Sequence, residues 1–345
     1  MASTMRAMVT TRHGGPEVVE LRTVPVPRPA EGQVLVEVSA AGCNNTDLWS
    51  REGTYGTDEP SGWLGVPLDF PRIQGGDVAG TVVELGAGVD TSLEGARVLV
   101  DPALYDGPGD DALIADIIGS ERDGGFAELV VVPAASLHRV DDSPLSDVEL
   151  GALPIAYGTA LGMVERGGVD AGDTVLVTGA SGGVGLAAVQ LATARGARVV
   201  AVCSAAKADA VRAAGADEIV DRGRGNVVDE VRAAAPDGID CAVDVVAGDT
   251  LAAGLALLRP GGRWVVAGAL GGHRVELDIR DLYLANQALV GSTMHTPAMF
   301  RRLVEMARGG DLRPVVAATY PLEDLAKAHE DLASRRLVGK LVVTP

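Results

Sequence analysis

A glycine-rich turn, Ala180-Ser-Gly-Gly-Val-Gly185, lies between a run of β-branched residues and a stretch of good helix formers. The run Thr174–Thr178 is typical of a strand buried on both faces, and Gly185–Ala194 predicts a helix. A glycine turn lets the backbone approach an anion, and the helix N-terminus offers free N–H groups and a positive dipole end. The stretch therefore predicts a pyrophosphate site, with a ligand-free βα turn as the alternative.

The second strand ends about 20 residues further on, where a carboxylate would bind the adenosine ribose 2′-OH of NAD. The sequence instead has Ser204 and Lys207 there, with no carboxylate before Asp209. A hydroxyl followed by a lysine suits a 2′-phosphate, and Arg222, after the third strand, could add a second cation. This pattern favours NADPH as the cofactor. Ordinary solvated surface charge is the alternative for both cations.

Around this turn the chain alternates between strands and helices, which predicts a parallel sheet. We expect an α/β protein in which a doubly wound Rossmann domain with a six-stranded parallel sheet spans residues 141–296. Residues 1–140 predict a β-rich domain, and residues 297–345 a C-terminal part that returns to it. The six expected strands are Thr174–Thr178, Arg198–Cys203, Glu218–Val220, Ile239–Val245, Arg263–Ala267 and Ala288–Met294.

In the β-rich part we expect one short helix, Thr46–Glu52, capped by Asn45 or Thr46. Two long loops, Gly53–Arg72 and Asp101–Gly125, are candidates for functional segments. The expected strands are Arg6–Thr10, Val18–Thr23, Gln33–Ala40, Ala79–Leu85, Arg97–Val100 and Phe126–Val132.

The net charge of −18 argues against nucleic acid and anionic membranes as partners. Cys43, Cys203 and Cys241 are widely spaced, which predicts neither a disulfide framework nor a zinc site. The N-terminal residues lack an apolar signal region and no apolar run is long enough for a membrane span, so we expect a soluble, cytoplasmic protein.

Several motifs, in this order, resemble the medium-chain dehydrogenase/reductase superfamily, and specifically its zinc-free quinone oxidoreductase branch. They are Ala41-Gly-Cys-Asn-Asn-Thr-Asp47, Ile73-Gln-Gly-Gly-Asp-Val-Ala-Gly80, Asp123-Gly-Gly-Phe-Ala-Glu128, the glycine turn, and Val338-Gly-Lys-Leu-Val342. The resemblance covers essentially the whole chain and implies that the first domain is GroES-like.

Where the zinc alcohol dehydrogenases have a cysteine ligand, this chain has Asn44, and where they have a histidine followed by glutamate it has Gly76 and Asp77. The four cysteines of their structural zinc lobe are missing from Asp101–Gly125. Without thiolate or imidazole ligands at these positions, the usual tetrahedral zinc site cannot assemble. The comparison implies a reaction without a metal.

The resemblance also implies site residues. Asn44, Thr46 and Tyr55 are the candidate catalytic residues, and Trp49, Tyr55, Trp63 and His295 the candidate substrate-binding residues. Packing is the alternative for Trp49 and Tyr55, a cap or turn for Asn44, and a solvent-exposed loop histidine for His295. The expected cofactor contacts are Thr159, Gly182, Gly183, Val184, Ser204, Lys207, Arg222, Val245, Val246, Gly268, Ala269 and Lys340.

The first functional hypothesis is a zinc-independent oxidoreductase that transfers hydride from NADPH to a quinone or to a C=C bond next to a carbonyl. Asn44, Thr46 or Tyr55 would donate a hydrogen bond to the developing oxyanion, and Tyr55 or water would supply the proton. The second is a zinc-independent ketone or aldehyde reductase, and the third a non-catalytic NADPH-binding protein. The family resemblance further implies a homodimer that pairs through the strand Ala288–Met294.

Overall fold

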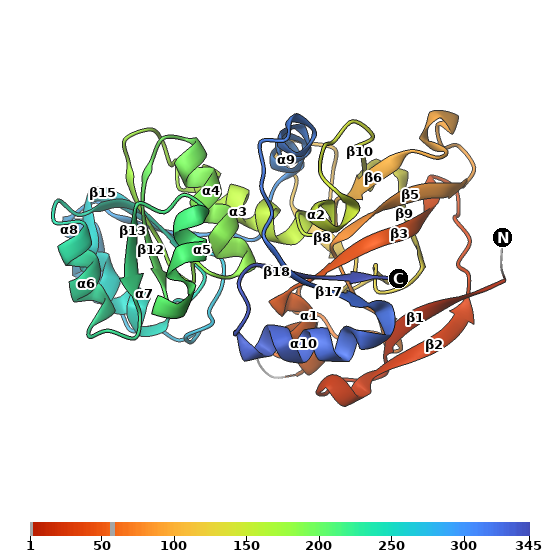
Figure 1. Ribbon diagram of the computed structural model, residues 1–345, viewed down its shortest axis with the longest axis horizontal. Coiled ribbons are helices and arrows are strands. Elements are labelled where there is room, and N and C mark those ends of the chain that lie inside the picture. The colour runs from red at the N-terminus through yellow and green to blue at the C-terminus, as the bar shows by residue number, and fades with distance from the viewer. Residues whose placement is uncertain (1–2, 56–58) are drawn as a thin grey trace. The chain divides into compact units, whose positions relative to one another are not determined.

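The computed structural model describes residues 3–55 and 59–345. These residues form two compact units (Figure 1). Unit 1 contains residues up to Ile155 together with Thr296–Pro345, and unit 2 contains Ala156–His295. The first division therefore falls after Ile155, whereas the sequence patterns placed it after residue 140.

Unit 1 is built around β3, an eleven-residue strand that pairs antiparallel with β5, β9 and β18. Its largest sheet has the order β10-β6-β5-β3-β18-β17, and smaller sheets are β2-β1-β4 and β7-β8. The strands are β1 (Thr4–Thr10), β2 (Val19–Pro25), β3 (Gln33–Cys43), β4 (Arg72–Ile73), β5 (Val78–Leu85), β6 (Arg97–Val100), β7 (Ala103–Tyr105), β8 (Ile114–Ile117), β9 (Leu129–Pro133), β10 (Leu137–Arg139), β17 (Val316–Pro321) and β18 (Lys340–Thr344). The helices are α1 (Asn45–Glu52), α2 (Asp147–Leu150), α9 (Pro297–Gly309) and α10 (Leu325–Ser334).

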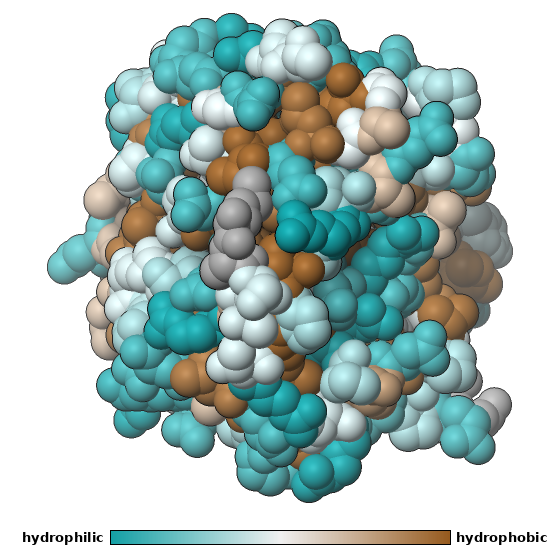
Figure 2. Space-filling model, turned by 90° about the vertical axis from the view of Figure 1, so that its right-hand side faces the viewer, coloured by the Kyte–Doolittle hydropathy of each residue, from teal (hydrophilic) through white to brown (hydrophobic). Residues whose placement is uncertain are grey.

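The core of unit 1 consists mainly of small β-branched residues, because aromatic residues are only 3% of the sequence. Val34, Leu35 and Val36 of β3 are fully buried, which fits a strand with neighbours on both sides. The face of the molecule in Figure 2 carries mostly hydrophilic residues with apolar residues gathered between them.

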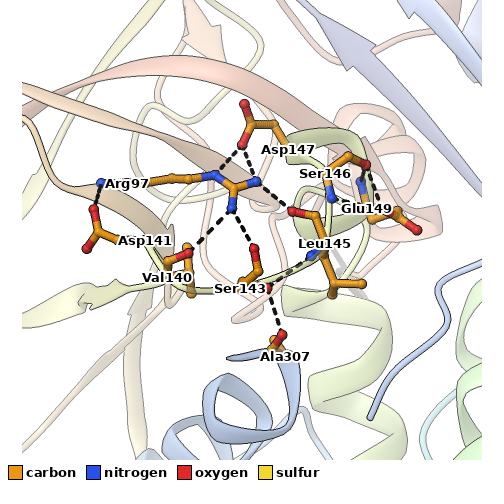
Figure 3. Close-up of polar contacts among 9 residues, drawn as sticks. All are labelled: Arg97, Val140, Asp141, Ser143, Leu145, Ser146, Asp147, Glu149 and Ala307. Carbon is orange, nitrogen blue, oxygen red and sulfur yellow. Dashed lines mark hydrogen bonds and ion pairs between the residues drawn. The ribbon is translucent and has the colours of Figure 1, made fainter. Parts of the chain in front are cut away.

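Arg97 joins β6 to the segment that follows β10 (Figure 3). Its Nε donates to Asp147 Oδ1 at 2.6 Å and its Nη2 to the Leu145 carbonyl at 2.7 Å, while its backbone N–H donates to Asp141 Oδ1 at 2.9 Å. Nearby, Ser143 Oγ donates to the Ala307 carbonyl of α9 at 2.7 Å. One half-buried guanidinium therefore satisfies several loop acceptors that no strand could pair.

Unit 2 contains a parallel sheet of six strands among its described residues, in the order β13-β12-β11-β14-β15-β16. This order confirms the predicted Rossmann domain. The strands are β11 (Thr174–Val177), β12 (Arg198–Cys203), β13 (Glu218–Asp221), β14 (Ile239–Asp244), β15 (Leu258–Val266) and β16 (Ala288–Gly291). The helices are α3 (Pro154–Arg166, which begins in unit 1), α4 (Gly183–Ala194), α5 (Ala208–Ala213), α6 (Val227–Ala234), α7 (Gly248–Gly254) and α8 (Ile279–Leu284).

Several predicted boundaries were wrong. The cap of α1 is Asn44 rather than Asn45 or Thr46, and β16 ends at Gly291, three residues before the predicted end. The Asp101–Gly125 loop contains the β7–β8 hairpin, whose short strands leave no long alternating pattern. The sequence patterns also missed α8.

A buried arginine–histidine pair connects α1 to α10 in unit 1. Arg51 is 2% exposed and its Nη1 lies 2.9 Å from Nδ1 of His329, which is 1% exposed. The Phe126 ring packs edge to face against the imidazole, with the two ring centroids 5.7 Å apart. Burial, helped by the Arg51 charge, lowers the pKa of His329 to about 3. Because the guanidinium can only donate, Nδ1 must be the acceptor, and the imidazole is neutral in the folded state.

We expect this histidine to make unit 1 sensitive to acid. The unfolded imidazole gains a proton below its ordinary pKa of about 6.5, whereas the folded one stays neutral down to about 3, so stability is lost as pH falls below 6.5. Between pH 7.5 and 5 the wild type should lose about 2 kcal/mol more than His329→Asn, which keeps an acceptor for Arg51. Urea unfolding at both pH values measures this, and equal losses would contradict the assignment.

Candidate active site

The end of β3 in unit 1 carries a buried polar cluster formed by Asn44, Asp77 and Lys340. The pairing of Cys43 with Leu341 places the first residue of β18 beside Asn44, and Asp77 comes directly before β5, the other neighbour of β3. Lys340 Nζ donates to Asp77 Oδ2 at 2.8 Å, to Asn44 Oδ1 at 2.6 Å and to the Cys43 carbonyl at 2.8 Å. The three donors of the ammonium therefore each have an acceptor within unit 1.

The side chain of Asn44 is also fully engaged in this cluster. Its Nδ2 donates to Asp77 Oδ2 at 2.9 Å and to the Gly42 carbonyl at 3.3 Å, while its Oδ1 accepts from Lys340. Asp77 Oδ1 accepts from the Ile155 N–H at 2.6 Å, and Asp77 is fully buried. Asn44 is thus arranged to hold the start of α1 in place, and both of its amide hydrogens already have acceptors.

The first turn of α1 carries a second buried carboxyl group, Asp47. Its Oδ2 accepts from the Asn44 N–H at 2.7 Å, which satisfies one free donor of the helix N-terminus. Burial raises the pKa of Asp47 to about 7, although the Asn44 hydrogen bond and the Lys340 charge act in the opposite direction. Sequence reasoning did not assign Asp47 or Asp77 a role in this cluster, because their partners come from distant segments.

Among the candidate catalytic residues, Thr46 is the one whose side-chain hydroxyl is available for a further hydrogen bond. It is 9% exposed, and its hydroxyl makes no hydrogen bond of normal geometry among the described residues. It lies near the phenol of Tyr55, whose pKa is raised mainly by burial and is lowered in part by Thr46. The Trp49 and Tyr55 rings meet edge to face at 5.8 Å. The structure therefore brings together Thr46, Tyr55 and Trp49 at α1 and the turn that follows it.

Trp63 lies in the loop after α1, of which residues 56–58 are outside the described residues. The backbone N–H of Trp63 donates to Ser120 Oγ at 3.2 Å, and the backbone N–H of Leu64 donates to Glu121 Oε1 at 3.0 Å. The Glu121 charge also helps to raise the pKa of Tyr55. The segment that contains Trp63 is thus held by residues 120–121, close enough to Tyr55 for the two to interact electrostatically.

A cavity of about 420 Å³ opens elsewhere in unit 1, between β1, β2, β4 and β9. Its lining does not include Asn44, Thr46 or Tyr55. Its three arginines are each paired with a carboxylate, Arg22 with Glu20, Arg72 with Asp123 and Arg122 with Asp116. The cavity therefore offers no excess positive charge to an anionic ligand.

In unit 2 the glycine turn has the geometry that the motif predicted. Gly179 has φ +57°, and Gly182 is the N-cap of α4. A Cβ at position 185 would lie 2.3 Å from the Gly179 carbonyl oxygen, so only glycine fits there. The first N–H groups of α4, from Gly183 and Val184, are left for an anion, and the residues present fit a pyrophosphate.

The adenosine end of the expected cofactor site brings two cations together. The Arg222 N–H donates to the Cys203 carbonyl at 2.9 Å, which places Arg222 beside the end of β12. The pKa of Lys207 is lowered by partial burial and then by the positive charge of Arg222. Ser204 is the N-cap of the 3-10 turn Ala205–Lys207, and Asp221, which sequence reasoning missed, accepts from the Ala205 N–H at 3.1 Å.

The other expected cofactor contacts follow β14 and β15. The Leu270 and Gly271 N–H groups donate to the Val245 and Val246 carbonyls at 3.3 and 2.7 Å, so these two loops lie side by side. A Cβ at position 268 would lie 2.9 Å from the Val245 carbonyl oxygen. The two loops are therefore closely packed, and together they contain the predicted residues Val245, Val246, Gly268 and Ala269.

Thr159 of α3 and His295 lie in the same part of unit 2. A Cβ at position 158 would lie 2.2 Å from Nδ1 of His295, and Arg166 Nη1 donates to the Met294 carbonyl at 2.8 Å. His295 is 2% exposed, which contradicts the alternative of a solvent-exposed loop histidine. The glycine at 158 lets α3 approach closely enough to bury the imidazole, which the local sequence does not reveal.

Within residues 3–55 and 59–345, no group of three or more His, Cys, Asp and Glu side chains is arranged to hold a metal ion. No helix in this part of the chain is both long and apolar enough to cross a membrane.

Two family models match the chain. The Alcohol dehydrogenase GroES-like domain matches residues 30–142, and the Zinc-binding dehydrogenase model matches residues 183–308. The human quinone oxidoreductase is 31% identical over 98% of this chain and 97% of its own length. The chain therefore belongs to the medium-chain dehydrogenase/reductase superfamily of oxidoreductases and is quinone oxidoreductase-like, as the motifs predicted.

Solved structures agree with this assignment. A structure from Sinorhizobium meliloti 1021, assigned as an alcohol dehydrogenase, has a TM-score of 0.94 and 44% identity, covering 100% of this chain and 98% of that one. The 2-octenoyl-CoA carboxylase reductase, solved with NADP and 2-octenoyl-CoA, has a TM-score of 0.88 and 27% identity, covering 100% of this chain and 88% of that one. These likenesses confirm the GroES-like and Rossmann fold.

Proposed function

We propose that the protein is a zinc-independent reductase that uses NADPH to reduce a quinone or a C=C bond next to a carbonyl. The observation that carries the proposal is the position of the Lys340 ammonium. It donates to both Asn44 and Asp77. Asn44 stands where the zinc branch has a cysteine ligand, and Asp77 stands where that branch has the glutamate that follows its histidine ligand. Asn44 and Gly76 supply neither a thiolate nor an imidazole, so this cluster holds no zinc ligand set of the usual kind.

The assignment to NADPH rests on Lys207 and Arg222. Like charges that lie close together repel, and the 2′-phosphate of NADPH would relieve this repulsion while accepting charge-assisted hydrogen bonds. Ser204 would donate a further hydrogen bond. The relative solved with NADP supports the same cofactor class.

When NADPH is bound it supplies a hydride to the electron-poor carbon of the acceptor. The glycine turn would hold the pyrophosphate, and the residues after β14 and β15 would contact the other half of the cofactor. The Thr46 hydroxyl would stabilise the oxyanion that forms on the acceptor by donating a hydrogen bond to it. Tyr55 lies next to this hydroxyl and can pass it a proton, while Trp49 packs beside the phenol and excludes water.

The substrate class is supported by two relatives, one named as a quinone oxidoreductase and one solved with an enoyl-CoA. The structural neighbour assigned as an alcohol dehydrogenase supports the alternative, a reductase of saturated ketones or aldehydes. Consumption of NADPH and NADH with a quinone, an enone and a saturated ketone separates these functions. We expect turnover with the quinone or the enone and NADPH, and turnover of only the ketone would favour the alternative.

Replacing Thr46 by Val should lower kcat by about 100-fold while leaving KM for the acceptor within about threefold. A donor that acts on the oxyanion contributes mainly in the transition state, at about 2.7–4 kcal/mol. Thr46→Ser keeps the hydroxyl and is the matched control, with an expected loss below fivefold. Steady-state rates with a saturating enone measure both variants, and equal losses in both would show that Thr46 acts through packing.

The expected homodimer would form through β16, the edge strand of the parallel sheet. Leu289 of β16 is 43% exposed, and Tyr283 and Leu284 of α8 are 59% and 72% exposed. An apolar edge strand of this kind is normally covered by another chain. We expect sedimentation at twice 35.2 kDa for the wild type and at 35.2 kDa for Leu289→Lys. Leu113→Lys, at a 72% exposed position in unit 1, should remain dimeric.

A further inference from the structure

Asp244, the last residue of β14, is a fully buried carboxyl group with four hydrogen bonds. Its Oδ1 accepts from Thr178 Oγ1 at 2.5 Å and from the Val246 and Ala247 N–H groups at 2.8 and 3.0 Å. Its Oδ2 accepts from Trp264 Nε1 at 2.8 Å. All four partners are electrically neutral.

The hydrogen bonds of Asp244 suit the ionised form of its side chain. The three N–H partners can only donate. Thr178 Oγ1 accepts from the Val245 N–H at 3.2 Å and donates to Asp244 Oδ1 at 2.5 Å. An ionised carboxylate offers about four lone-pair positions, which matches the four donors that surround it. The site therefore holds a full negative charge that these four dipoles stabilise and no cation among them neutralises.

This charge lies at the point where the strand order of the sheet reverses. β11 has β12 and β13 on one side and β14 and β15 on the other, and a dinucleotide crosses such a sheet at the carboxyl ends of the strands. Lys207 and Arg222 place the adenosine half at the ends of β12 and β13. The nicotinamide half therefore belongs at the end of β14, where Asp244 and the segment Val245–Ala247 lie.

The segment after Asp244 is held in an unusual conformation by the same carboxylate. Ala247 has φ +55° and ψ −138°, a combination that costs a non-glycine residue free energy. The hydrogen bonds from the Val246 and Ala247 N–H groups to Asp244 offset this cost. The backbone beneath the expected nicotinamide position is thus fixed by a negatively charged side chain.

We propose that Asp244 favours the oxidised cofactor and so promotes hydride transfer by stabilising the positive charge that forms on the nicotinamide ring. The inference rests on the proposed function, in which NADPH is the hydride donor. As the C–H bond breaks, the hydride and its electron pair pass to the acceptor carbon, which is reduced, and the ring changes from neutral to a single positive charge. A buried carboxylate that keeps its charge throughout is attracted only to the product of that change.

The test compares the dissociation constants of NADP⁺ and NADPH in Asp244→Asn. At effective protein dielectric constants and a separation of about 10 Å, one charge pair is worth on the order of tenfold in affinity. We expect NADP⁺ to bind about tenfold more weakly relative to NADPH than in the wild type. Calorimetric titration measures both constants without any turnover. A slower single-turnover hydride transfer should accompany the change.

Thr178→Val is the matched control, because it removes one hydrogen bond to Asp244 and one to Val245 while keeping the charge. It should change the affinities for both cofactor forms by the same factor. In Asp244→Asn the new amide faces the Trp264 N–H, so Asp244→Asn combined with Trp264→Phe removes this conflict if the single variant is unstable. Trp264→Phe alone is then the reference for the double variant.

The outcomes separate the inference from the proposed function. If the wild type binds neither NADP⁺ nor NADPH, the proposed cofactor is wrong. If the wild type binds both and Asp244→Asn keeps the wild-type ratio of dissociation constants, Asp244 acts only on the loop and the inference is overturned. A selective loss of NADP⁺ affinity, absent from Thr178→Val, supports it.

Discussion

Replacing Lys340 by Met is expected to lower the thermal unfolding midpoint by roughly 6–20 °C and to abolish most of the reductase activity. The ammonium of Lys340 lies 2.8 Å from Asp77 Oδ2, and the two side chains are 5% and 0% exposed. Removing one partner of such a pair leaves an uncompensated buried charge, which costs about 3–5 kcal/mol. Asn44 Oδ1 would lose the hydrogen bond that Lys340 donates to it, so the start of α1, which carries Thr46, would be released.

The double variant Asp77→Asn with Lys340→Met separates charge from packing. It removes both charges, so its melting temperature should recover most of the loss seen in Lys340→Met. Lys327→Met removes an exposed lysine that lies over the Tyr320 ring and should shift the midpoint by no more than about 2 °C. Differential scanning calorimetry measures all three variants. A Lys340→Met variant as stable as the wild type would contradict the buried pair of Lys340 and Asp77.

The second large effect concerns the choice of cofactor. Replacing both Lys207 and Arg222 by Ala should raise KM for NADPH by about 100-fold or more and leave KM for NADH within about threefold. Charge-assisted hydrogen bonds to a phosphate contribute about 1.5–3 kcal/mol each, and NADH has no 2′-phosphate to lose them. The preference between the two cofactors should therefore disappear or reverse.

Arg212→Ala is the control for this pair of substitutions. Arg212 lies close enough to Cys203 to affect its pKa, but it forms an ion pair with Asp209. Arg212→Ala tests whether the loss of any nearby positive charge raises KM for NADPH in the same way. Steady-state kinetics with each cofactor at a saturating acceptor concentration gives the KM values. An equal rise in KM for NADPH and NADH in the double variant would contradict a 2′-phosphate site.

The parallel sheet was predictable because its signals are local. The run Arg198–Cys203 is β-branched, is bounded by turn residues and matches β12 at both ends. The glycine turn likewise predicted the start of α4 to within two residues. The predicted end of β16 was wrong. Ser292 and Met294 are buried by contacts with Arg166 and α3 rather than by strand pairing. In the sequence alone, these residues look like a continuation of the strand.

The polar clusters could not be predicted, because their members are far apart in the sequence. Lys340 was expected at the cofactor, yet its three hydrogen bonds join β18 to Asn44 and Asp77, residues more than 260 positions away. Only the antiparallel pairing of β3 with β18 creates this contact. Asp244 carries a weak signal, an acidic residue at the carboxyl end of an otherwise buried strand, and that signal could have identified it.

The most direct test of the account is the fate of deuterium from NADPH that carries it at the transferable C4 position. Turnover with an enone should place the deuterium on the carbon β to the carbonyl and give the saturated ketone as product, in enzyme whose zinc content is below one-tenth of an atom per chain. Deuterium on the carbonyl carbon of an alcohol product, or activity that follows zinc content, would contradict a metal-free reduction of activated C=C bonds.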